Sequence, residues 1–188
     1  MLGELHRKAI HLSSLVIPVG YYLIPDEELS RRALLVATLI AIVIEAVRLN
    51  EPRIRWITLR LAGALLRESE KTGLFGSTYL ILGSLLCAHS FDKPIVVASI
   101  LFVILGDAAA ALVGRAYGRI QIFGKTLEGS LTCLAVCFVV GLALPGIPLK
   151  AAAVGAFTAT VFELLPIPLD DNMRIPLAAG FAMRLAMQ

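Results

Sequence analysis

The sequence predicts an all-α fold, a polytopic transmembrane helical bundle, and two observations lead to this prediction. Hydrophobic residues make up 58% of the 188 residues, and the mean hydropathy is +0.84. Charged residues make up only 16%, whereas an ordinary soluble domain has about 25%. A chain of this size cannot hide so much apolar surface in its own interior. We therefore expect residues 1–188 to form a single integral membrane domain.

The same composition excludes several other classes. Intrinsic disorder, a coiled coil and a collagen-like fibre each need a polar bias or a repeat that the chain lacks. The formal net charge of +3 comes from scattered basic residues, which argues against nucleic acid as a partner. No ligand cluster surrounds Cys87, Cys133 and Cys137. We interpret them as small core residues and not as a zinc or disulfide framework.

Seven apolar runs, separated by charged residues or by proline and glycine clusters, give the expected spans in order. They cover residues 9–24, 33–47, 76–91, 95–113, 130–144, 151–165 and 173–187. A transmembrane helix needs about 20 residues, so several of these runs must borrow flanking residues. No small-residue cleavage site follows the first run, which we interpret as a retained span and not as a signal peptide.

Residues 53–66 differ from these runs. Ile54, Ile57, Leu61 and Leu65 recur at a spacing of three or four residues, with arginines between them. This periodicity is typical of an amphipathic helix, which we expect to lie on the membrane surface. A solvated connector with chance periodicity is the alternative.

The basic residues predict the orientation, because lysine and arginine are enriched in cytoplasmic loops. With seven spans and the N-terminus inside, twelve of the seventeen lysines and arginines fall on the cytoplasmic side. These twelve are Arg7, Lys8, Arg48, Arg53, Arg55, Arg60, Arg67, Lys71, Arg115, Arg119, Lys125 and Arg174. Four polar clusters fall on the same side, so we expect a functional site at the cytoplasmic face.

The first two clusters are short. Glu4, Arg7 and His11 share one helical face, with Lys8 beside it. This arrangement fits either a functional site or a positive-inside anchor. Near the end of the second run, Glu45 and Arg48 are three residues apart, and here we favour a local ion pair.

The third cluster begins inside the fourth apolar run and continues into a glycine-punctuated loop. Its members are Asp107, Gly114, Arg115, Gly118, Arg119, Gly124, Lys125, Thr126, Glu128, Gly129 and Ser130. Glycines let backbone N–H groups turn toward an anion, and a helix N-terminus favours phosphate. With a carboxylate and three cations, the cluster suits a metal-bound polyphosphate. Small-residue packing beside a basic loop is the alternative.

The three residues Gly124, Lys125 and Thr126 imitate the end of a P-loop. A P-loop needs glycine at the position of Arg119 and a preceding strand inside a soluble sheet. We reject that interpretation.

The fourth cluster contains Glu163 and, after a proline-rich break, Asp170, Asp171 and Asn172. These residues supply the hard oxygen donors that suit Mg²⁺. The alternative is that Asp171 or Asn172 caps the last helix. Three such residues after an intramembrane glutamate favour a functional role.

In this order, the clusters resemble the polyprenol kinase family of CTP-dependent lipid kinases, which includes dolichol kinase, phytol kinase and the yeast-type diacylglycerol kinase. The residues that carry the resemblance are Glu4, Leu5, His6, Arg7, Lys8, His11, Gly106, Asp107, Ala108, Ala109, Ala110, Gly114, Arg115, Gly118, Lys125, Thr126, Leu127, Glu128, Gly129, Ser130, Glu163, Asp170, Asp171, Asn172, Pro176 and Leu177.

The resemblance implies a single catalytic domain that transfers the γ-phosphate of CTP to the hydroxyl of a membrane lipid alcohol, with Mg²⁺ as cofactor. The acceptor would be a polyprenol or dolichol, a phytol-like isoprenoid, or a diacylglycerol-like lipid. Eukaryotic dolichol kinases are much longer, so their substrate is not carried over. CTP, the lipid alcohol and the bilayer are the expected partners, and the sequence leaves a homo-oligomer open.

The residue roles follow from this resemblance, because phosphoryl transfer depends on positioning and charge neutralisation. The expected catalytic residues are Asp107, Arg7, Lys8, Lys125, Glu163 and Asp170. The expected CTP-binding residues are Gly114, Arg115, Gly118, Arg119, Lys125, Thr126, Glu128 and Gly129. The expected metal ligands are Asp107, Asp170, Asp171 and Asn172. Glu163, Asp170 and His11 are the candidates for the base that accepts the hydroxyl proton.

Two other functions are weighed against the kinase. The third cluster is also similar to the CDP-diacylglycerol synthases, so a cytidylyltransferase that attacks the α-phosphate of CTP is the first alternative. The clusters at Arg7 and Lys8 and at 170–172 favour the kinase. A small transporter with Asp107 and Glu163 as a relay is the second alternative. Its charges would lie near the midplane and its sequence would often repeat, and neither feature is present.

Overall fold

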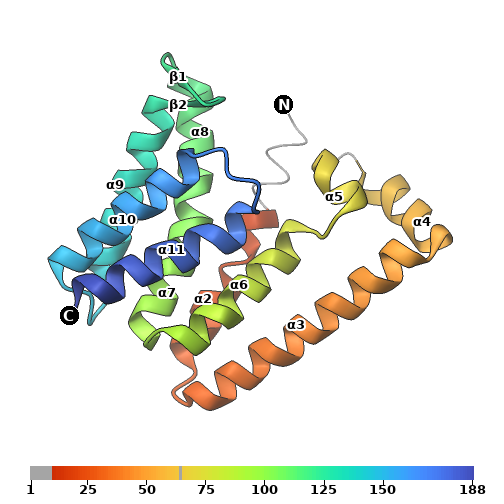
Figure 1. The fold of residues 1–188 in the computed structure, drawn as a ribbon, viewed down its shortest axis with the longest axis horizontal. Coiled ribbons are helices and arrows are strands. Elements are labelled where there is room, and N and C mark those ends of the chain that lie inside the picture. Colours follow the sequence, from red (N-terminus) through yellow and green to blue (C-terminus); the bar gives the residue numbers. More distant parts are fainter. Residues whose placement is uncertain (1–9, 64) are drawn as a thin grey trace.

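The structure, a computed structural model, describes residues 10–63 and 65–188, and it is largely helical (Figure 1). After a helical turn at 10–13, the elements are α2 (Val16–Leu23), α3 (Glu27–Asn50), α4 (Pro52–Ala62), α5 (Glu68–Thr72), α6 (Gly76–Ser90), α7 (Lys93–Leu101), the π-helix η1 (Phe102–Gly106), α8 (Asp107–Tyr117), β1 (Gln121–Ile122), β2 (Lys125–Thr126), α9 (Leu127–Ala143), α10 (Leu149–Leu164) and α11 (Asp171–Ala186). The prediction of an all-α fold is confirmed, apart from one short hairpin.

Each predicted apolar run coincides with a helical segment among the described residues. The fourth run is one continuous helix made of α7, η1 and α8. The largest difference is at α3, which begins at Glu27 and not at residue 33. Asp26 caps this helix by accepting from the backbone N–H groups of Glu28 and Leu29. Two pairs spaced i,i+4, Arg31 with Glu27 and Arg32 with Glu28, accommodate the charges inside the first turns.

Two of the described helices, Glu27–Asn50 and Lys93–Tyr117, are long and apolar enough to cross a bilayer. Only 17% of the apolar window of the first is buried, against 67% for the second. The helix α3 therefore presents most of its apolar surface outward, including Ile40, Val43 and Ile44. The number of spans and the orientation stay predictions.

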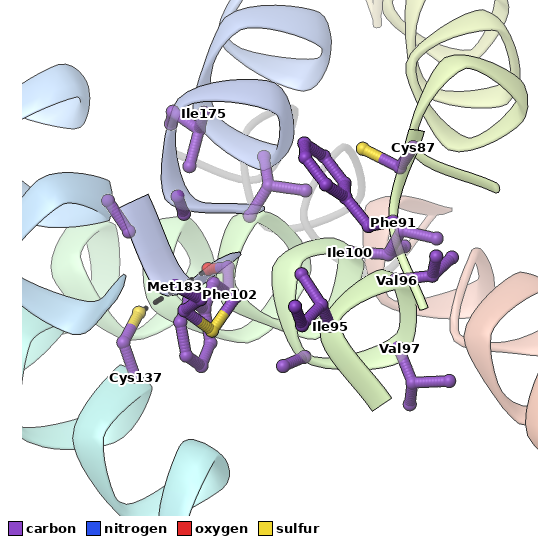
Figure 2. Close-up of a cluster of buried hydrophobic side chains, with 14 of the residues drawn as sticks. Cys87, Phe91, Ile95, Val96, Val97, Ile100, Phe102, Cys137, Ile175 and Met183 are labelled. Atoms are coloured by element: carbon purple, nitrogen blue, oxygen red, sulfur yellow. Dashed lines mark hydrogen bonds between the residues drawn. The ribbon is translucent and has the colours of Figure 1, made fainter. Parts of the chain in front are cut away.

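The core lies where the continuous helix of 93–117 meets α6, α9, α10 and α11 (Figure 2). Phe102 and Met183 are fully buried at its centre. Cys133 and Cys137 are buried free thiols with their Sγ atoms 3.9 Å apart, which confirms that they are core residues. A Cβ on Gly106 would lie 2.7 Å from the Cys137 Sγ. Small residues thus allow the helices to approach closely.

Three basic side chains stabilise the end of the bundle that holds the 24–26 and 91–92 connections. Arg31 donates to the carbonyl of Ala88, Lys93 to that of Ile24, and Arg184 to that of Ser90. Cations at helix C-termini compensate the exposed carbonyls and the helix dipole. Among the described residues, Arg115, Lys125 and Arg174 of the polar clusters lie toward the other end.

The amphipathic segment is helical, but it is shorter than predicted. The helix α4 ends at Ala62, with Gly63 as its C-cap, and none of its residues is buried. Ile54, Ile57 and Leu61 are exposed. Its position on a membrane surface stays a prediction.

Candidate active site

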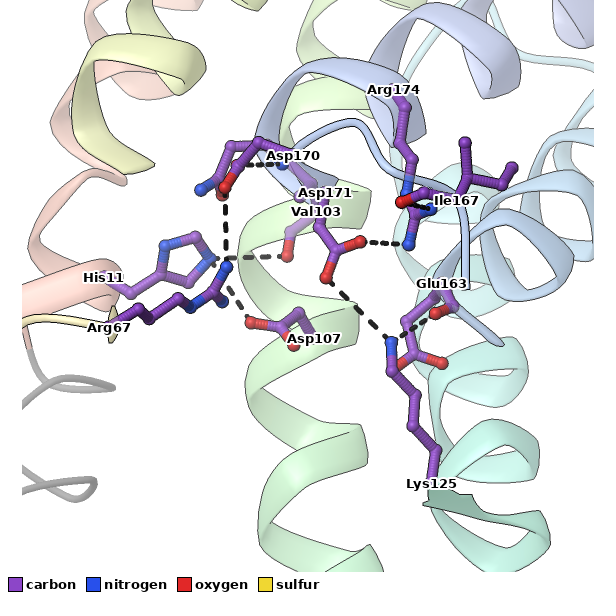
Figure 3. Close-up of polar contacts among 11 residues, drawn as sticks. His11, Arg67, Val103, Asp107, Lys125, Glu163, Ile167, Asp170, Asp171 and Arg174 are labelled. Carbon is purple, nitrogen blue, oxygen red and sulfur yellow. Dashed lines mark hydrogen bonds and ion pairs between the residues drawn. The ribbon is translucent and has the colours of Figure 1, made fainter. Parts of the chain in front are cut away.

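A cavity of about 620 Å³ opens at the end of the bundle where the β1–β2 hairpin lies. Its walls come from α8, the hairpin, the start of α9, and the facing ends of α10 and α11, with one residue from the start of α5. The ionisable residues that line this large cavity are Arg67, Asp107, Arg115, Lys125, Glu163 and Asp171. Residues far apart in sequence therefore meet around one space (Figure 3).

Asp107 is the first residue of α8, directly after the π-helix η1. A π-helical turn shifts the register of a helix and is frequent at functional sites. The side chain of Asp107 points toward the 10–13 turn, where the His11 Nε2 lies 3.9 Å from its Oδ2 and 3.4 Å from the Val103 carbonyl oxygen. His11, one of the candidates for the base, therefore lies next to Asp107.

Lys125 reaches the cavity from the hairpin. Phe123 and Gly124 form the turn with φ values of 49° and 78°, and positive φ at both positions is typical of a type I′ turn. The Lys125 Nζ lies 2.7 Å from the Glu163 Oε1 and 4.0 Å from the Asp171 Oδ2, and it also donates to the Glu163 carbonyl. This isolated hairpin is not the sheet that a P-loop needs, which confirms the rejection of that motif.

The glycines of the third cluster make room for Thr126, which caps α9 by accepting from the Gly129 N–H at 3.1 Å. A Cβ on Gly114 would lie 2.6 Å from the Thr126 Oγ1, and one on Gly118 would lie 2.5 Å from its Cγ2. Gly129 is similarly constrained by the Ala110 carbonyl. The packing alternative therefore holds for these glycines. They also line the large cavity, so packing and site formation coincide.

The cluster at 170–172 is divided between different surroundings. Asp170 is the N-cap of α11 and accepts from the Asn172 N–H at 3.0 Å. A side chain of this cluster therefore caps α11, as the alternative interpretation expects, but the capping residue is Asp170 and not Asp171 or Asn172. Burial raises the pKa of Asp170, while Arg67, whose Nη1 is 3.5 Å from the carboxylate, opposes this shift. Asp171 lines the large cavity, and Asn172 lines a neighbouring smaller pocket.

Two expected CTP-binding residues lie elsewhere. Arg119 and Glu128 line a separate hollow beside Gly118. Glu128 accepts from the Ile120 N–H at 3.4 Å, and bonds from its own and the Arg119 and Ile120 backbone N–H groups lower its pKa. Its side chain braces the connection before the hairpin and does not orient Lys125 in this structure. Arg7 and Lys8 lie outside the described residues.

Sequence reasoning missed two arginines at the site. Arg67 lines the large cavity, and Arg174 pairs with Asp171 and donates to the Ile167 carbonyl at 2.9 Å. From the sequence, both residues contribute only to the predicted positive charge of the cytoplasmic side. For Arg174 the signal was available, because it is spaced i,i+3 from Asp171 on a helix.

Arg67 owes its place to a buried ion pair on α3. The predicted pair of Glu45 and Arg48 is confirmed, with 2.5 Å between the Arg48 Nη2 and the Glu45 Oε2. Arg48 also donates to the Glu70 and Gly73 carbonyls, at 3.1 and 2.5 Å. Glu45 accepts from the Phe75 N–H at 2.5 Å. The pair thereby fixes the 67–75 segment against α3 and places Arg67 at the cavity.

The donor set at the cavity fits a magnesium ion that is also held by substrate phosphates. Among the described residues, no three His, Cys, Asp or Glu side chains form a group that could hold a metal. Mg²⁺, however, usually takes one or two carboxylates and completes its shell with phosphates and water. Asp107 and Asp171 line the same cavity, and the buried Glu163 Oε2 has no hydrogen-bond partner among the described residues.

Comparisons with known proteins place the chain in a family. A CTP-dependent diacylglycerol kinase of Schizosaccharomyces pombe is 27% identical over 209 residues, covering 98% of the chain and 94% of the relative. A probable phytol kinase of Glycine max is 32% identical over 139 residues, covering 63% of the chain and 46% of the relative. The chain thus spans nearly all of one relative and about half of the other.

An uncharacterized protein of Rickettsia prowazekii is 30% identical over 186 residues, covering 93% of the chain and 90% of the relative. No family model and no solved structure matches the chain. The named relatives support the resemblance that the motifs carry. The chain belongs to the family of CTP-dependent lipid kinases that includes the diacylglycerol and phytol kinases.

Proposed function

We propose that the protein transfers the γ-phosphate of CTP to the hydroxyl of a membrane lipid alcohol at the cytoplasmic face. The observation that carries the proposal is the large cavity, which is lined by Lys125, Arg115 and Arg67 together with Asp107, Glu163 and Asp171. Its volume of about 620 Å³ is within the usual range of ligand sites, about 300–1,000 Å³. Cations beside carboxylates suit a triphosphate that carries a metal ion.

The residues that line the large cavity would have different roles in binding the metal ion and the phosphates. Asp107 and Asp171 would hold Mg²⁺, which when bound supplies positive charge to the triphosphate. Lys125 and Arg115 bind phosphate oxygens, and Glu163 holds the Lys125 ammonium in place at 2.7 Å. The glycines around Thr126 leave room for its side chain in the cavity wall. These contacts position the γ-phosphate and balance its charge.

The transfer itself is a displacement at phosphorus. The lipid hydroxyl oxygen forms a bond to the γ-phosphorus, the bond to the β–γ bridging oxygen breaks, and CDP leaves with the electron pair. We assign the hydroxyl proton to His11, because its imidazole lies beside Asp107, which would pair with the imidazolium. Of the other base candidates, Glu163 is engaged with Lys125, and Asp170 caps α11.

The test is an analysis of the products. The purified protein in lipid nanodiscs, given CTP, Mg²⁺ and either a diacylglycerol or an isoprenoid alcohol, should release CDP in amounts equal to the lipid monophosphate formed. In a parallel reaction that contains a lipid phosphate in place of the alcohol, release of pyrophosphate with formation of a CDP-lipid would instead establish the cytidylyltransferase.

A further inference from the structure

A second, smaller pocket of about 210 Å³ adjoins the large cavity. Its walls come from the 10–13 turn and Ser14, from the end of α4 and the start of α5, and from the first residues of α6. Asp107 and Arg67 line both spaces. The two pockets therefore meet at these two side chains, at the end of the bundle where the polar residues gather.

The two spaces differ in chemistry. The surface of the large cavity is more polar than apolar, whereas that of the small pocket is mainly apolar. Ile10, Leu65, Leu66 and Phe75 contribute apolar side chains to the small pocket, and His11 lies beside Asp107 on its polar side. A site with apolar walls and a few polar groups suits a ligand that is a hydrocarbon with one polar end.

We propose that the small pocket binds the hydroxyl end of the acceptor lipid, with the first carbons of its chain against Leu65 and Leu66. This inference rests on the proposed kinase function. A lipid hydroxyl in the small pocket and a γ-phosphate in the large cavity would meet beside Asp107 and Arg67, which line both. Holding two reactants in contact in this way removes much of the entropic cost of their encounter.

The size of the pocket limits what enters it. Because a water molecule occupies about 30 Å³ of liquid, a space of about 210 Å³ admits only the polar end of a lipid. The rest of the chain must lie outside. Ala62, the last residue of α4, belongs to the wall, and α4 exposes Ile57 and Leu61 nearby in sequence. We infer that the lipid tail leaves the pocket beside α4.

The wall of the small pocket is held by hydrogen bonds of its own. The carboxylate of Glu70 accepts from the Arg67 N–H and from the Gly76 N–H, both at 2.7 Å. Arg48 donates to the Glu70 carbonyl. A Cβ on Gly76 would lie 2.9 Å from the Asn172 Nδ2, so α6 and α11 approach closely here. A pocket fixed in this way is preformed for its ligand.

The first test locates the lipid without requiring turnover. The full chain in nanodiscs is irradiated with a diacylglycerol that carries a diazirine close to its hydroxyl, and in parallel with a similarly labelled isoprenoid alcohol. Labelled peptides containing residues 62–66 or 75–77, protected by excess unlabelled lipid alcohol, are the expected result. Labelling confined to the outer face of α3 would overturn the proposal, even if the protein proves to be a kinase.

The second test separates the lipid from the nucleotide. Leu66→Trp fills the small pocket, and Leu149→Trp, at a side chain that is 65% exposed at the start of α10 and outside the pocket, is its control. The pocket variant should raise the KM for the lipid alcohol by about tenfold, which corresponds to about 1.4 kcal/mol, and leave the KM for CTP unchanged. It should also lose the photolabelling. Equal labelling and equal lipid KM in both variants would refute the site, whereas pocket labelling without phosphorylation would refute only the kinase.

Discussion

Asp107 lines both the large cavity and the small pocket. Its carboxylate also lies beside His11. Asp107, Lys125 and Glu163 are among the catalytic residues that the family resemblance implies, and all three line the large cavity. Their catalytic roles stay predictions. The arrangement makes Asp107 the most sensitive position of the site.

We expect Asp107→Asn to reduce the kcat for lipid phosphorylation by about 100-fold or more, the scale of effect when one electrostatic contact to a transition state is lost. The amide removes the negative charge while it keeps the shape. The measurement is the initial rate of lipid monophosphate formation. Asp92→Asn, at an exposed N-cap of α7, is the matched control and should keep full activity. Full activity of the Asp107 variant would exclude its assigned role.

Arg67 shows why part of the site was beyond sequence reasoning. In sequence it is one of several arginines near the amphipathic segment. It reaches the cavity only because Arg48 and Glu45, on another helix, bind the backbone of the 70–75 segment. No local pattern encodes a contact between α3 and that segment. The small pocket, which depends on the same segment, was missed for the same reason.

At the scale of elements, the apolar runs predicted the positions of the helices. They did not predict the irregular turn inside one helix or the residue that caps another. The helix of 93–117 was expected from its apolar run, but the π-helix of η1 was not. A π-helical turn depends on the packing around it and not on a residue pattern. In the same way, the sequence offers Asp171 or Asn172 as the cap of α11, whereas the cap in the structure is the preceding residue, Asp170.

The contact between α8 and α9 gives a prediction about packing. Gly114→Ala should destabilise the protein by about 1–3 kcal/mol, the usual cost of overpacking, because the new Cβ would lie 2.6 Å from the Thr126 Oγ1. It should also weaken CTP binding, since Thr126 lines the large cavity. The measurements are the thermal unfolding midpoint and the KM for CTP. Gly20→Ala has no atom within 4 Å of its Cβ and should leave both unchanged. An unaltered Gly114 variant would contradict the close packing.

The ion pair on α3 gives a second prediction for an element. Arg48→Ala leaves the buried Glu45 carboxylate without its cation, and breaking a buried pair costs about 3–5 kcal/mol. We expect a lower thermal unfolding midpoint and an elevated lipid KM, because the 67–75 segment loses its anchor. Arg32→Ala removes an exposed pair with Glu28, which is worth about 0–1 kcal/mol. Equal stability of the two variants would show that the buried pair does not hold the segment.

At the scale of the whole molecule, composition and hydropathy were sufficient to predict a helical membrane protein. Each apolar run coincides with a helical segment because each run must be buried against other helices or lipid, whereas α4 and α5 lie outside these runs. The scarce charges were informative for the same reason. Their convergence at one end could be inferred only by assuming seven spans, and that assumption is testable.

The predicted topology is checked by labelling in whole cells. With the N-terminus inside, a cysteine from Lys150→Cys should react with a membrane-impermeant maleimide. One from Ser69→Cys should react only after permeabilisation, because α5 lies at the opposite end of the bundle. The three native cysteines are buried, so the labelling of the unchanged protein serves as the background. The reverse pattern of labelling would place the site on the other face of the membrane.

The most direct measurement of the central claim uses CTP labelled with different phosphorus isotopes at the α and γ positions. The wild-type protein is supplied with Mg²⁺ and a mixture of a lipid alcohol and a lipid phosphate, and the isotope ratio is measured in the lipid product. The proposed kinase predicts that the lipid carries only the γ label and that the CDP released carries the α label. A lipid product carrying the α label would contradict the account.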